Sequence, residues 1–342
     1  MKIYNGYELG MRQIYYVAEV NSSHSGSVEI AKKMIDAAYD AGCDCVKFQS
    51  WTADTLYSKD YYDKNPITKR VVAKFSLSED ELSECAEYCS KKGVSFCSTP
   101  YSKREVDFLV RHNVPFIKIA SMDINNYPFL EYIAHTGKPI VLSTGMADLF
   151  EIDRAVECLE SSGNKELCLL HCVSIYPTEP RDVNLNNILL LRSRYPNHSV
   201  GFSDHTLGTN IAPAAIAMGA VLIEKHLTLD RAKVGMDNQM ALEPNEMKLL
   251  IEGCNEVTKA LGSDQRDVSV NELEQRKKMR RSIVVTHDIK AGHVIQSCDL
   301  DAKRPGIGIP PSETNSLIGK TLARDVLADT LLSPDDILHT HG

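Results

Sequence analysis

The chain has 342 residues, 43% hydrophobic and 25% charged, which is the composition of a globular protein with one large domain and a small one. Its net charge of −8, with KKMRR (277–281) as the longest basic stretch, excludes nucleic acid as the main partner. No apolar run is long enough to span a membrane, and Met1 opens no signal-peptide pattern, so we expect no membrane association and a cytoplasmic protein.

Short runs rich in Val, Ile, Phe and Leu alternate with helical patterns over the first 260 residues or so. Strands are predicted at residues 14–20, 43–50, 94–100, 114–121, 138–145, 166–173, 198–205 and 220–227. Helices are predicted at residues 29–42, 78–93, 102–112, 127–137, 151–163, 184–195, 211–220 and 243–262. Eight strands that are each followed by a helix predict an α/β fold, the (β/α)8 TIM barrel. An open doubly wound sheet is the alternative, but EVNSSHSGS after the first strand lacks its GxGxxG turn.

The residue pattern of the sequence changes after a charged segment near residue 265. Short β-like pieces then alternate with Gly and Pro turns, which predicts a small β-rich domain. The predicted division is a barrel over residues 1–265, a linker over 266–281 and the small domain over 282–342. So few residues bury little apolar surface, and we expect the small domain to dock on a barrel.

Polar residues occur at the ends of all eight predicted strands, where TIM barrels hold their chemistry. In chain order they are Glu19, His24, Lys47, Gln49, Ser98, Thr99, Lys118, Ser121, Asp123, Ser143, Thr144, Ser174, Tyr176, Ser203, Asp204, His205, Glu224, Lys225 and His226. Together they predict an active site at this end of the barrel.

His205 and His226 end adjacent predicted strands, so their imidazoles can converge on a divalent metal. The alternative is that each is a core histidine bonded to a backbone carbonyl. The ten cysteines include no CxxC pair, so we expect neither structural zinc nor disulfides.

Lys47, Lys118 and Lys225 lie within strands, where an unpaired ammonium is unfavourable. With neighbouring Ser and Thr hydroxyls they predict a cradle for an anion that carries phosphate. One lysine could instead form a Schiff base. A third possibility is simple pairing with Glu19 or Glu224, especially for Lys225, which follows Glu224 in the sequence.

The sequence resembles the sialic acid synthase family, which includes legionaminate and pseudaminate synthases. The motifs that carry the resemblance are AEVNSSHSGS, DAAYDAGCDCVKFQ, FCSTPYS, FIKIASMDINNYPFL, PIVLSTGM, LLHCVSIYPTEPRDVNL, GFSDHTLG and MGAVLIEKHLTLD. The tail, DIKAGHVI…KRPGIGI…IGK, resembles the family's C-terminal antifreeze-like domain (SAF, β-clip). The motifs cover nearly the whole chain and occur in family order.

The resemblance implies condensation of phosphoenolpyruvate with an N-acylated hexose, either N-acetylmannosamine or a related 2,4-diacetamido-trideoxyhexose. The products are a nonulosonic (sialic-type) acid and phosphate, formed with C–O cleavage. The resemblance also implies Mn²⁺ or Mg²⁺ and a domain-swapped homodimer, in which the small domain of one chain covers the barrel of the other.

The resemblance assigns roles position by position. Glu19, His205 and His226 match catalytic residues, and both histidines match metal ligands. The positions that match phosphoenolpyruvate contacts are Lys47, Thr99, Lys118, Ser121, Ser143, Ser174 and Ser203. The positions that match sugar contacts are Gln49, Asp123, Tyr176, Asp237 and Arg304, the last delivered by the partner chain. The chain departs from the common motifs at Ser23, Met122 and Asp123, which leaves the identity of the sugar open.

Three alternatives stay open on the sequence. The first is a Schiff-base class I aldolase of 2-keto-3-deoxy sugar acids that uses Lys47 or Lys118. The second is a non-catalytic protein whose antifreeze-like domain binds ice or glycan. The third is a phosphoenolpyruvate-dependent barrel synthase that acts on a phosphorylated pentose or tetrose.

Overall fold

The computed structural model describes residues 1–3, 7–10, 13–233 and 235–338. The chain forms two compact units, Met1–Gly262 and Ser263–Gly342, and each is described by itself. No helix in the described part of the chain is long and apolar enough to cross a membrane.

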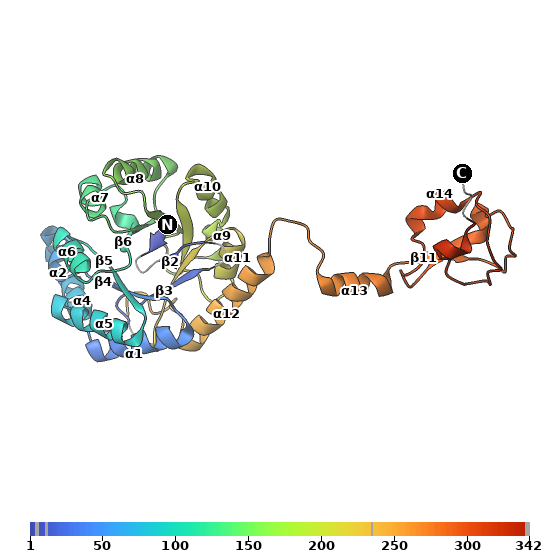
Figure 1. The fold of residues 1–342 in the computed structure, drawn as a ribbon. Helices are drawn as coiled ribbons and strands as arrows, with labels where there is room; N and C mark the ends of the chain where they lie inside the picture. Colours follow the sequence, from blue (N-terminus) through green and yellow to red (C-terminus); the bar gives the residue numbers. More distant parts are fainter. Residues whose placement is uncertain (4–6, 11–12, 234, 339–342) are drawn as a thin grey trace. The chain divides into compact units, whose positions relative to one another are not determined.

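The first unit is a parallel eight-stranded barrel (Figure 1). Its strands are β3 (Tyr15–Glu19), β4 (Cys45–Gln49), β5 (Ser95–Thr99), β6 (Ile117–Ile119), β7 (Ile140–Ser143), β8 (Leu167–Cys172), β9 (Ser199–Asp204) and β10 (Leu222–His226). They are hydrogen-bonded in the order β5-β4-β3-β10-β9-β8-β7-β6. The two end strands meet where Cys97 Sγ lies 3.4 Å from the carbonyl oxygen of Phe116. All eight predicted strands are present, and the predicted TIM-barrel fold class is confirmed.

Helices surround the strands and cover their outer faces (Figure 1). The predicted helices correspond to α1 (Val28–Ala41), α5 (Glu79–Lys92), α6 (Lys103–Arg111), α7 (Tyr127–Ala134), α8 (Leu149–Ser161), α10 (Asn186–Arg194), α11 (Ile211–Ala217) and α12 (Pro244–Leu261). Ser78 and Glu81 form the capping box at the start of α5, because each side chain bonds the other's backbone N–H. Within the described residues of the first unit, four further α-helices lie outside the predicted segments: α2 (Ala53–Leu56), α3 (Lys59–Lys64), α4 (Pro66–Phe75) and α9 (Pro180–Val183).

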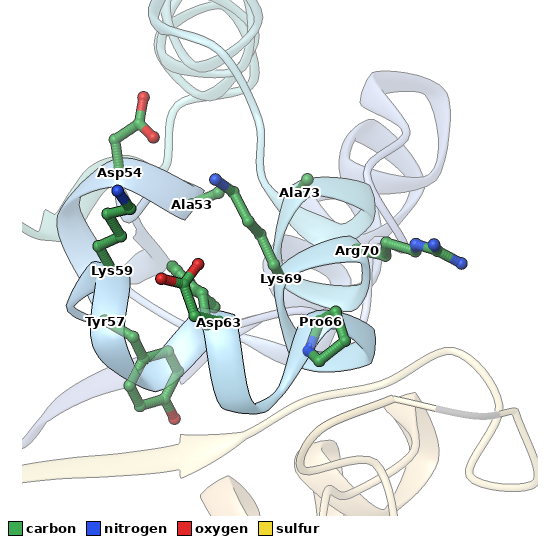
Figure 2. A pocket seen from close by; sticks show the side chains of 10 residues that line it. Ala53, Asp54, Tyr57, Lys59, Asp63, Pro66, Lys69, Arg70 and Ala73 are labelled. Atoms are coloured by element: carbon green, nitrogen blue, oxygen red, sulfur yellow. The ribbon is translucent and has the colours of Figure 1, made fainter.

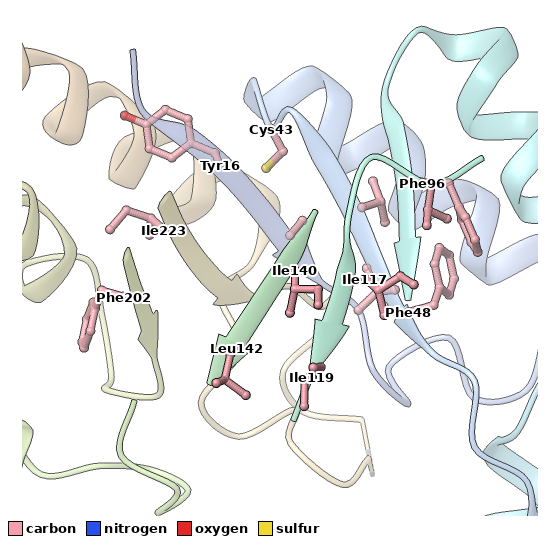
Figure 3. Packing of buried hydrophobic residues seen from close by; sticks show 14 of the residues in the cluster. Tyr16, Cys43, Phe48, Phe96, Ile117, Ile119, Ile140, Leu142, Phe202 and Ile223 are labelled. Atoms are coloured by element: carbon pink, nitrogen blue, oxygen red, sulfur yellow. The ribbon is translucent and has the colours of Figure 1, made fainter. Parts of the chain in front are cut away.

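Side chains that alternate along the strands form two apolar layers. Outward-facing residues pack under the helices, with Tyr16, Phe48, Ile119 and Phe202 among them (Figure 3). A second, separate cluster consists of Leu9, Tyr15, Val17, Cys45, Cys97, Phe116, Val141, Cys168, Leu170, Val221 and Leu222. Most of its members lie on the strands and share the inward-facing parity, so they fill the barrel interior.

The N-terminal segment adds a short antiparallel pair, β1 (Lys2–Ile3) and β2 (Tyr7–Glu8). Leu9, which follows β2, packs into the interior cluster with Tyr15 and Leu222, near the start of their strands. Apolar side chains therefore fill the barrel interior near the amino ends of these strands in the part of the chain that the structure describes.

The second unit has its own small core. An antiparallel pair, β11 (Ser282–Val285) and β12 (Leu300–Lys303), packs with turn-rich segments that include η2 (Ser297–Asp299), η3 (Pro311–Glu313), α14 (Thr314–Leu317) and η4 (Pro334–Asp336). Ile283, Val285, Leu322 and Leu332 are buried together in it. The predicted linker contains a helix, α13 (Val270–Met279), all of whose residues are at least partly exposed.

Candidate active site

A cavity of about 370 Å³, which we call the active-site cavity, lies at the carboxyl ends of the barrel strands. The sequence-predicted site residues that line it are Glu19, Lys47, Gln49, Thr99, Lys118, Ser121, Ser143, Ser174, Tyr176, Ser203, His205, His226 and Asp237. Every barrel strand, or the loop directly after it, supplies at least one of these polar groups. Asp237 comes from the loop after β10.

Strand parity explains why these residues face inward. On β3 the interior residues Tyr15 and Val17 are followed two positions later by Glu19, and on β10 Leu222 is followed by Glu224 and His226. Because side chains alternate along a strand, each barrel-filling apolar residue is continued by a polar residue at the mouth. The register pairs His226 with Glu19 and Glu19 with Lys47, so the three lie side by side across neighbouring strands.

Two lysines and two glutamates form a buried charge cluster in the cavity. Lys47 pairs with Glu19, and its Nζ lies 3.6 Å from Glu224 Oε2. Lys118 Nζ lies 3.9 Å from Glu224 Oε1, so Glu224 is shared by both cations. All four side chains are less than a tenth exposed. Opposite charges balance in the cluster, which makes the burial of four ionisable groups tolerable.

The cluster shifts the acidity of its members. Burial, with a smaller contribution from the neighbouring Glu224, raises the pKa of Glu19 to about 7 against the opposing effect of Lys47. Burial lowers the pKa of Lys118, and Lys47 acts in the same direction. A carboxyl group with a pKa near neutrality is suited to exchange protons during a reaction.

Hydroxyl groups surround the cations. Lys118 Nζ donates to Ser143 Oγ at 2.7 Å, and Lys47 Nζ donates to Thr99 Oγ1 at 3.2 Å. Ser203 Oγ donates to Glu224 Oε1 at 2.9 Å. These contacts bring together residues that lie far apart in the sequence, and they produce the predicted cradle of cations and hydroxyls.

Ser121 joins this cradle through a close backbone approach. The N–H of Gly145 donates to Ser121 Oγ at 3.1 Å. A Cβ atom at position 145 would lie 2.8 Å from the same oxygen and 2.4 Å from Ser174 Oγ, so a larger residue there would displace both hydroxyls.

Gln49 is held by two aromatic residues. Trp51 Nε1 and Tyr101 Oη both donate to its Oε1, at 2.9 and 2.8 Å. Because two donors occupy its oxygen, Gln49 presents its NH₂ group to a ligand. Trp51 and Tyr101 line the same cavity, although neither was among the predicted site residues.

His205 and His226 lie together, with ring centroids 5.5 Å apart. Tyr176 packs against His205 at 4.3 Å between centroids. The carbonyl of Val173 accepts a hydrogen bond from His205 Nδ1 at 2.8 Å, which leaves Nε2 as the ring nitrogen available to a ligand. Burial, together with the positive charge of His205 and Lys47, lowers the pKa of His226 well below its usual value, so its imidazole is neutral.

This donor set fits a divalent metal. Two neighbouring imidazoles, one of them oriented by a backbone carbonyl, are an arrangement found in metal-binding histidines. The Asp237 carboxylate lies 4.0 Å from His226 Nδ1. In the part of the chain that the structure describes, no cluster of three or more His, Cys, Asp or Glu forms a complete metal site. A metal held by the two histidines would take its other ligands from water or substrate.

Two predicted site residues lie elsewhere. Asp123 belongs to the short helix η1 (Ser121–Asp123), accepts from Asn126 Nδ2 at 3.1 Å and is not among the residues that line the cavity. Arg304 belongs to the second unit, directly after β12.

Several strand-end residues face away from the cavity, and Lys225 is one of them. Lys225 does not pair with Glu224 or join the cradle. It forms an ion pair of 2.9 Å with Asp204 and donates to the Thr206 carbonyl at 2.5 Å. The reason is parity, because residue 225 points to the opposite side of β10 from Glu224 and His226. Ser98 and Thr144 likewise bond outside the cavity, to Ser50 and to the Leu170 carbonyl.

The cavity wall also contains residues for which the sequence predicted no site role. They are Asn21, Trp51, Leu56, Tyr57, Tyr101, Ala120, Met122, Met146, Cys172 and Met236. Glu224, one of the predicted strand-end residues, also lines the cavity. Tyr57 also lines a second, outer hollow of about 710 Å³ between α2 and α4, which Lys59, Asp63 and Lys69 surround (Figure 2).

The fold and the cavity together define a TIM-barrel enzyme, because the polar groups converge where such barrels carry out chemistry. The model of the NeuB family matches residues 34–266, and the model of the SAF domain matches residues 280–338. The chain therefore belongs to the NeuB family, and the predicted resemblance is confirmed. It is a sialic acid synthase-type enzyme, which makes it a transferase.

Named relatives are similar over nearly their whole length. An N,N′-diacetyllegionaminic acid synthase from Legionella pneumophila is 36% identical over 331 residues, which cover 93% of each chain. An N-acetylneuraminate-9-phosphate synthase from Drosophila melanogaster is 33% identical over 359 residues, which cover 95% of this chain and 96% of the relative. The crystal structure of an N-acetylneuraminic acid synthetase from Leptospira borgpetersenii in complex with citrate is 33% identical. It has a TM-score of 0.72 and covers 78% of this chain and 91% of that one.

Proposed function

We propose that the chain condenses phosphoenolpyruvate with an N-acylated hexose to give a nonulosonic acid and inorganic phosphate. The observation that carries the proposal is the presence, in one cavity, of two buried lysines with hydroxyl partners and two neighbouring imidazoles. The first group suits a phosphorylated anion, and the second suits a metal that activates a carbonyl. The relatives named as synthases of legionaminic and N-acetylneuraminic acids supply the class of sugar.

In this proposal the cradle binds phosphoenolpyruvate. The phosphate and the carboxylate are contacted by Lys47, Thr99, Lys118, Ser121, Ser143, Ser174 and Ser203, the positions that the resemblance assigns to phosphoenolpyruvate. Glu224 is the counter-ion of both lysines before the anion arrives. The pKa of Glu19, raised to about 7, leaves part of this group ionised near neutral pH and able to accept a proton.

The hexose occupies the outer part of the cavity in its open-chain form. The Gln49 amide, Tyr176 and Asp237 contact its hydroxyl and acylamino groups. A divalent metal on His205 and His226 would polarise the aldehyde oxygen when bound. Since imidazole is a better ligand for Mn²⁺ than for Mg²⁺, we propose Mn²⁺ as the native ion.

The reaction forms one C–C bond and breaks one C–O bond. C3 of phosphoenolpyruvate attacks the aldehyde carbon, and the aldehyde oxygen becomes a hydroxyl after it gains a proton. Water adds at C2 and loses a proton to Glu19 in its ionised form. The tetrahedral adduct then expels phosphate by cleavage of the C2–O bond, and Lys118 with its hydroxyl neighbours stabilises the departing anion.

We further propose that residues 1–265 form the synthase domain and residues 282–342 an SAF domain, joined by residues 266–281. The SAF domain of one chain covers the barrel of its partner in a swapped homodimer and supplies Arg304 to the sugar. A guanidinium has five N–H donors and is suited to hydrogen-bonding several sugar hydroxyls.

The proposal is tested by phosphate release from phosphoenolpyruvate with a panel of N-acylated hexoses, each product being identified by mass. We expect one or more hexoses to give a product heavier than the sugar by a pyruvate unit, with one phosphate released per product. Phosphate release that does not depend on any sugar in the panel would contradict it.

A Schiff-base aldolase is the second candidate, and the lowered pKa of the buried Lys118 favours it. Reduction with borohydride in the presence of pyruvate separates the two. An aldolase gains a stable adduct on Lys118 or Lys47 and loses activity, whereas the synthase gains no adduct.

A further inference from the structure

Residue 21 occupies an unusual position at the edge of the active-site cavity. Asn21 follows β3 by two residues, is 4% exposed and has a positive φ of 33°, in the region that non-glycine residues rarely adopt. Asparagine is among the residues that tolerate this backbone conformation best. Its side chain lines the cavity that also holds Glu19, His226 and Asp237.

Three consecutive residues of the loop after β3 form hydrogen bonds with the loop after β10, and we call each of these bonds a staple. Asn21 Nδ2 donates to Asp237 Oδ2, the backbone N–H of Met236 donates to Ser22 Oγ at 3.1 Å, and Ser23 Oγ donates to Asn238 Oδ1 at 2.5 Å. The backbone N–H of Asn21 also donates to Glu19 Oε1 at 2.6 Å. Asn21 is thus fixed from both its main chain and its side chain.

These contacts determine which way the carboxamide faces. The group that faces the Asp237 carboxylate must be the NH₂, since an oxygen there would be repelled. The other end, Oδ1, is buried and has no hydrogen-bond partner in the described part of the chain. A buried carbonyl oxygen without a donor is unfavourable, so a hydrogen-bond donor on a ligand in the cavity would complete the site.

We propose that Asn21 is a specificity-determining residue whose Oδ1 accepts a hydrogen bond from the sugar substrate. This inference rests on the proposed function, because it takes the cavity's ligand to be an N-acylated hexose. The donor is either the acylamino N–H or a hydroxyl O–H of the sugar. Because Asn21 Nδ2 holds Asp237, the same side chain also positions a second proposed sugar contact.

The test compares Asn21→Gly with wild type on matched substrates. Glycine accepts the positive φ without strain, so the variant removes the carboxamide and leaves the backbone conformation available. We expect kcat/KM for the N-acylated hexose to fall about tenfold, the effect of one lost hydrogen bond to a substrate, while KM for phosphoenolpyruvate stays the same. Two analogues identify the donor: an N-methylated acylamino sugar, which lacks the N–H, and deoxy sugars, which each lack one hydroxyl. The variant should handle the analogue that lacks the relevant donor as well as wild type does.

Ser23→Ala is the matched control. It removes a neighbouring staple of the same loop, but Ser23 does not line the cavity. We expect it to change kcat/KM for the sugar and all analogues by the same factor. Thermal unfolding of both variants checks that the barrel remains folded.

The inference is overturned if wild type turns over the N-acylated hexose but Asn21→Gly lowers kcat/KM equally for every analogue. That result would make residue 21 a purely structural staple. If wild type turns over no N-acylated hexose at all, the proposed function fails instead, so the two failures are distinguishable.

Discussion

The Lys118 ammonium lies 2.7 Å from Ser143 Oγ, and the two residues are on the adjacent strands β6 and β7. Lys118 Nζ also donates to the Ile119 carbonyl at 3.2 Å, so the two hydrogen bonds together hold a buried cation at the wall of the cavity. Both side chains are nearly fully buried, so an anion that meets them is also largely removed from water. Charge-assisted hydrogen bonds are strongest in such surroundings.

Replacement of Lys118 by Met should therefore weaken phosphoenolpyruvate binding. A hydrogen bond to a charged group contributes about 1.5–3 kcal/mol, so we expect kcat/KM for phosphoenolpyruvate to fall at least tenfold, mainly through KM. Ser143→Ala should have a smaller effect in the same direction. Thr144→Val is the control, because Thr144 is the next residue but bonds the Leu170 carbonyl outside the cavity. Equal effects of Ser143→Ala and Thr144→Val would argue against the cradle.

We expect kcat to decrease at acid pH because Glu19 becomes protonated, which gives the pH profile an acid limb. Burial raises its pKa to about 7, and only the ionised form accepts a proton from water. As pH falls below this value the ionised fraction decreases, so we expect kcat to fall about tenfold per pH unit. Glu19→Gln should lower kcat and flatten this limb. A Glu19→Gln enzyme that keeps the same acid limb would assign it to another group.

Metal dependence should follow the two histidines. We expect His226→Ala to bind Mn²⁺ at least tenfold more weakly in isothermal titration and to lose turnover, since half of the protein's imidazole ligands are gone. Chelator should inactivate wild type, and added Mn²⁺ should restore it. His171→Ala is a useful comparison, because His171 lies on β8 but bonds the Val183 carbonyl outside the cavity. Unchanged Mn²⁺ affinity in His226→Ala would contradict the assignment.

Hydrophobic periodicity predicted the eight strands and eight helices, and the missing GxGxxG turn after the first strand favoured the barrel over an open doubly wound sheet. The periodicity also located the strand ends and thus most of the cavity wall. It did not separate Glu224 from Lys225, because the sequence shows polarity while the face of a strand depends on single-residue register.

Contacts between distant loops could not be predicted from the sequence, for a different reason. Asn21 and Asp237 lie 216 positions apart, and their hydrogen bond exists only because β3 and β10 are neighbours in the barrel. The helices α2 to α4 are short and largely exposed. They were not predicted, because none of them has a long apolar stripe in its sequence.

Domain swapping makes a specific prediction for mixed dimers. Arg304→Ala and His205→Ala chains should each be inactive alone. After subunit exchange in equal amounts, a swapped heterodimer has one barrel with His205 that is covered by a small domain with Arg304. Random exchange makes half of the dimers hybrid, so about a quarter of wild-type activity should return.

A mixture of His205→Ala with His226→Ala is the control, because every barrel then keeps one defect and no activity should return. If mass measurements demonstrate Arg304→Ala/His205→Ala heterodimers that remain inactive, Arg304 acts within its own chain or has no catalytic role.

Asp44 should make the barrel less stable at neutral pH than in mild acid. Its carboxylate is half-buried before β4 and accepts from the backbone N–H of Tyr16 at 2.8 Å. Burial raises its pKa to about 6 in spite of this bond, above the value of about 4 in an unfolded chain. The folded state therefore holds a proton that the unfolded state releases, and the free energy of unfolding decreases as pH rises from about 4 to about 6.

The Asp44→Asn substitution tests this stability effect, because an asparagine side chain can accept the same hydrogen bond without charge. We expect Asp44→Asn to exceed wild type by ~2 kcal/mol in urea unfolding at about pH 8 and to match it at about pH 4. Asp40→Asn is the control, because Asp40 is exposed on α1 and should show no such difference. A gain in Asp44→Asn that is the same at both pH values would mean that the substitution acts through packing rather than through the buried charge.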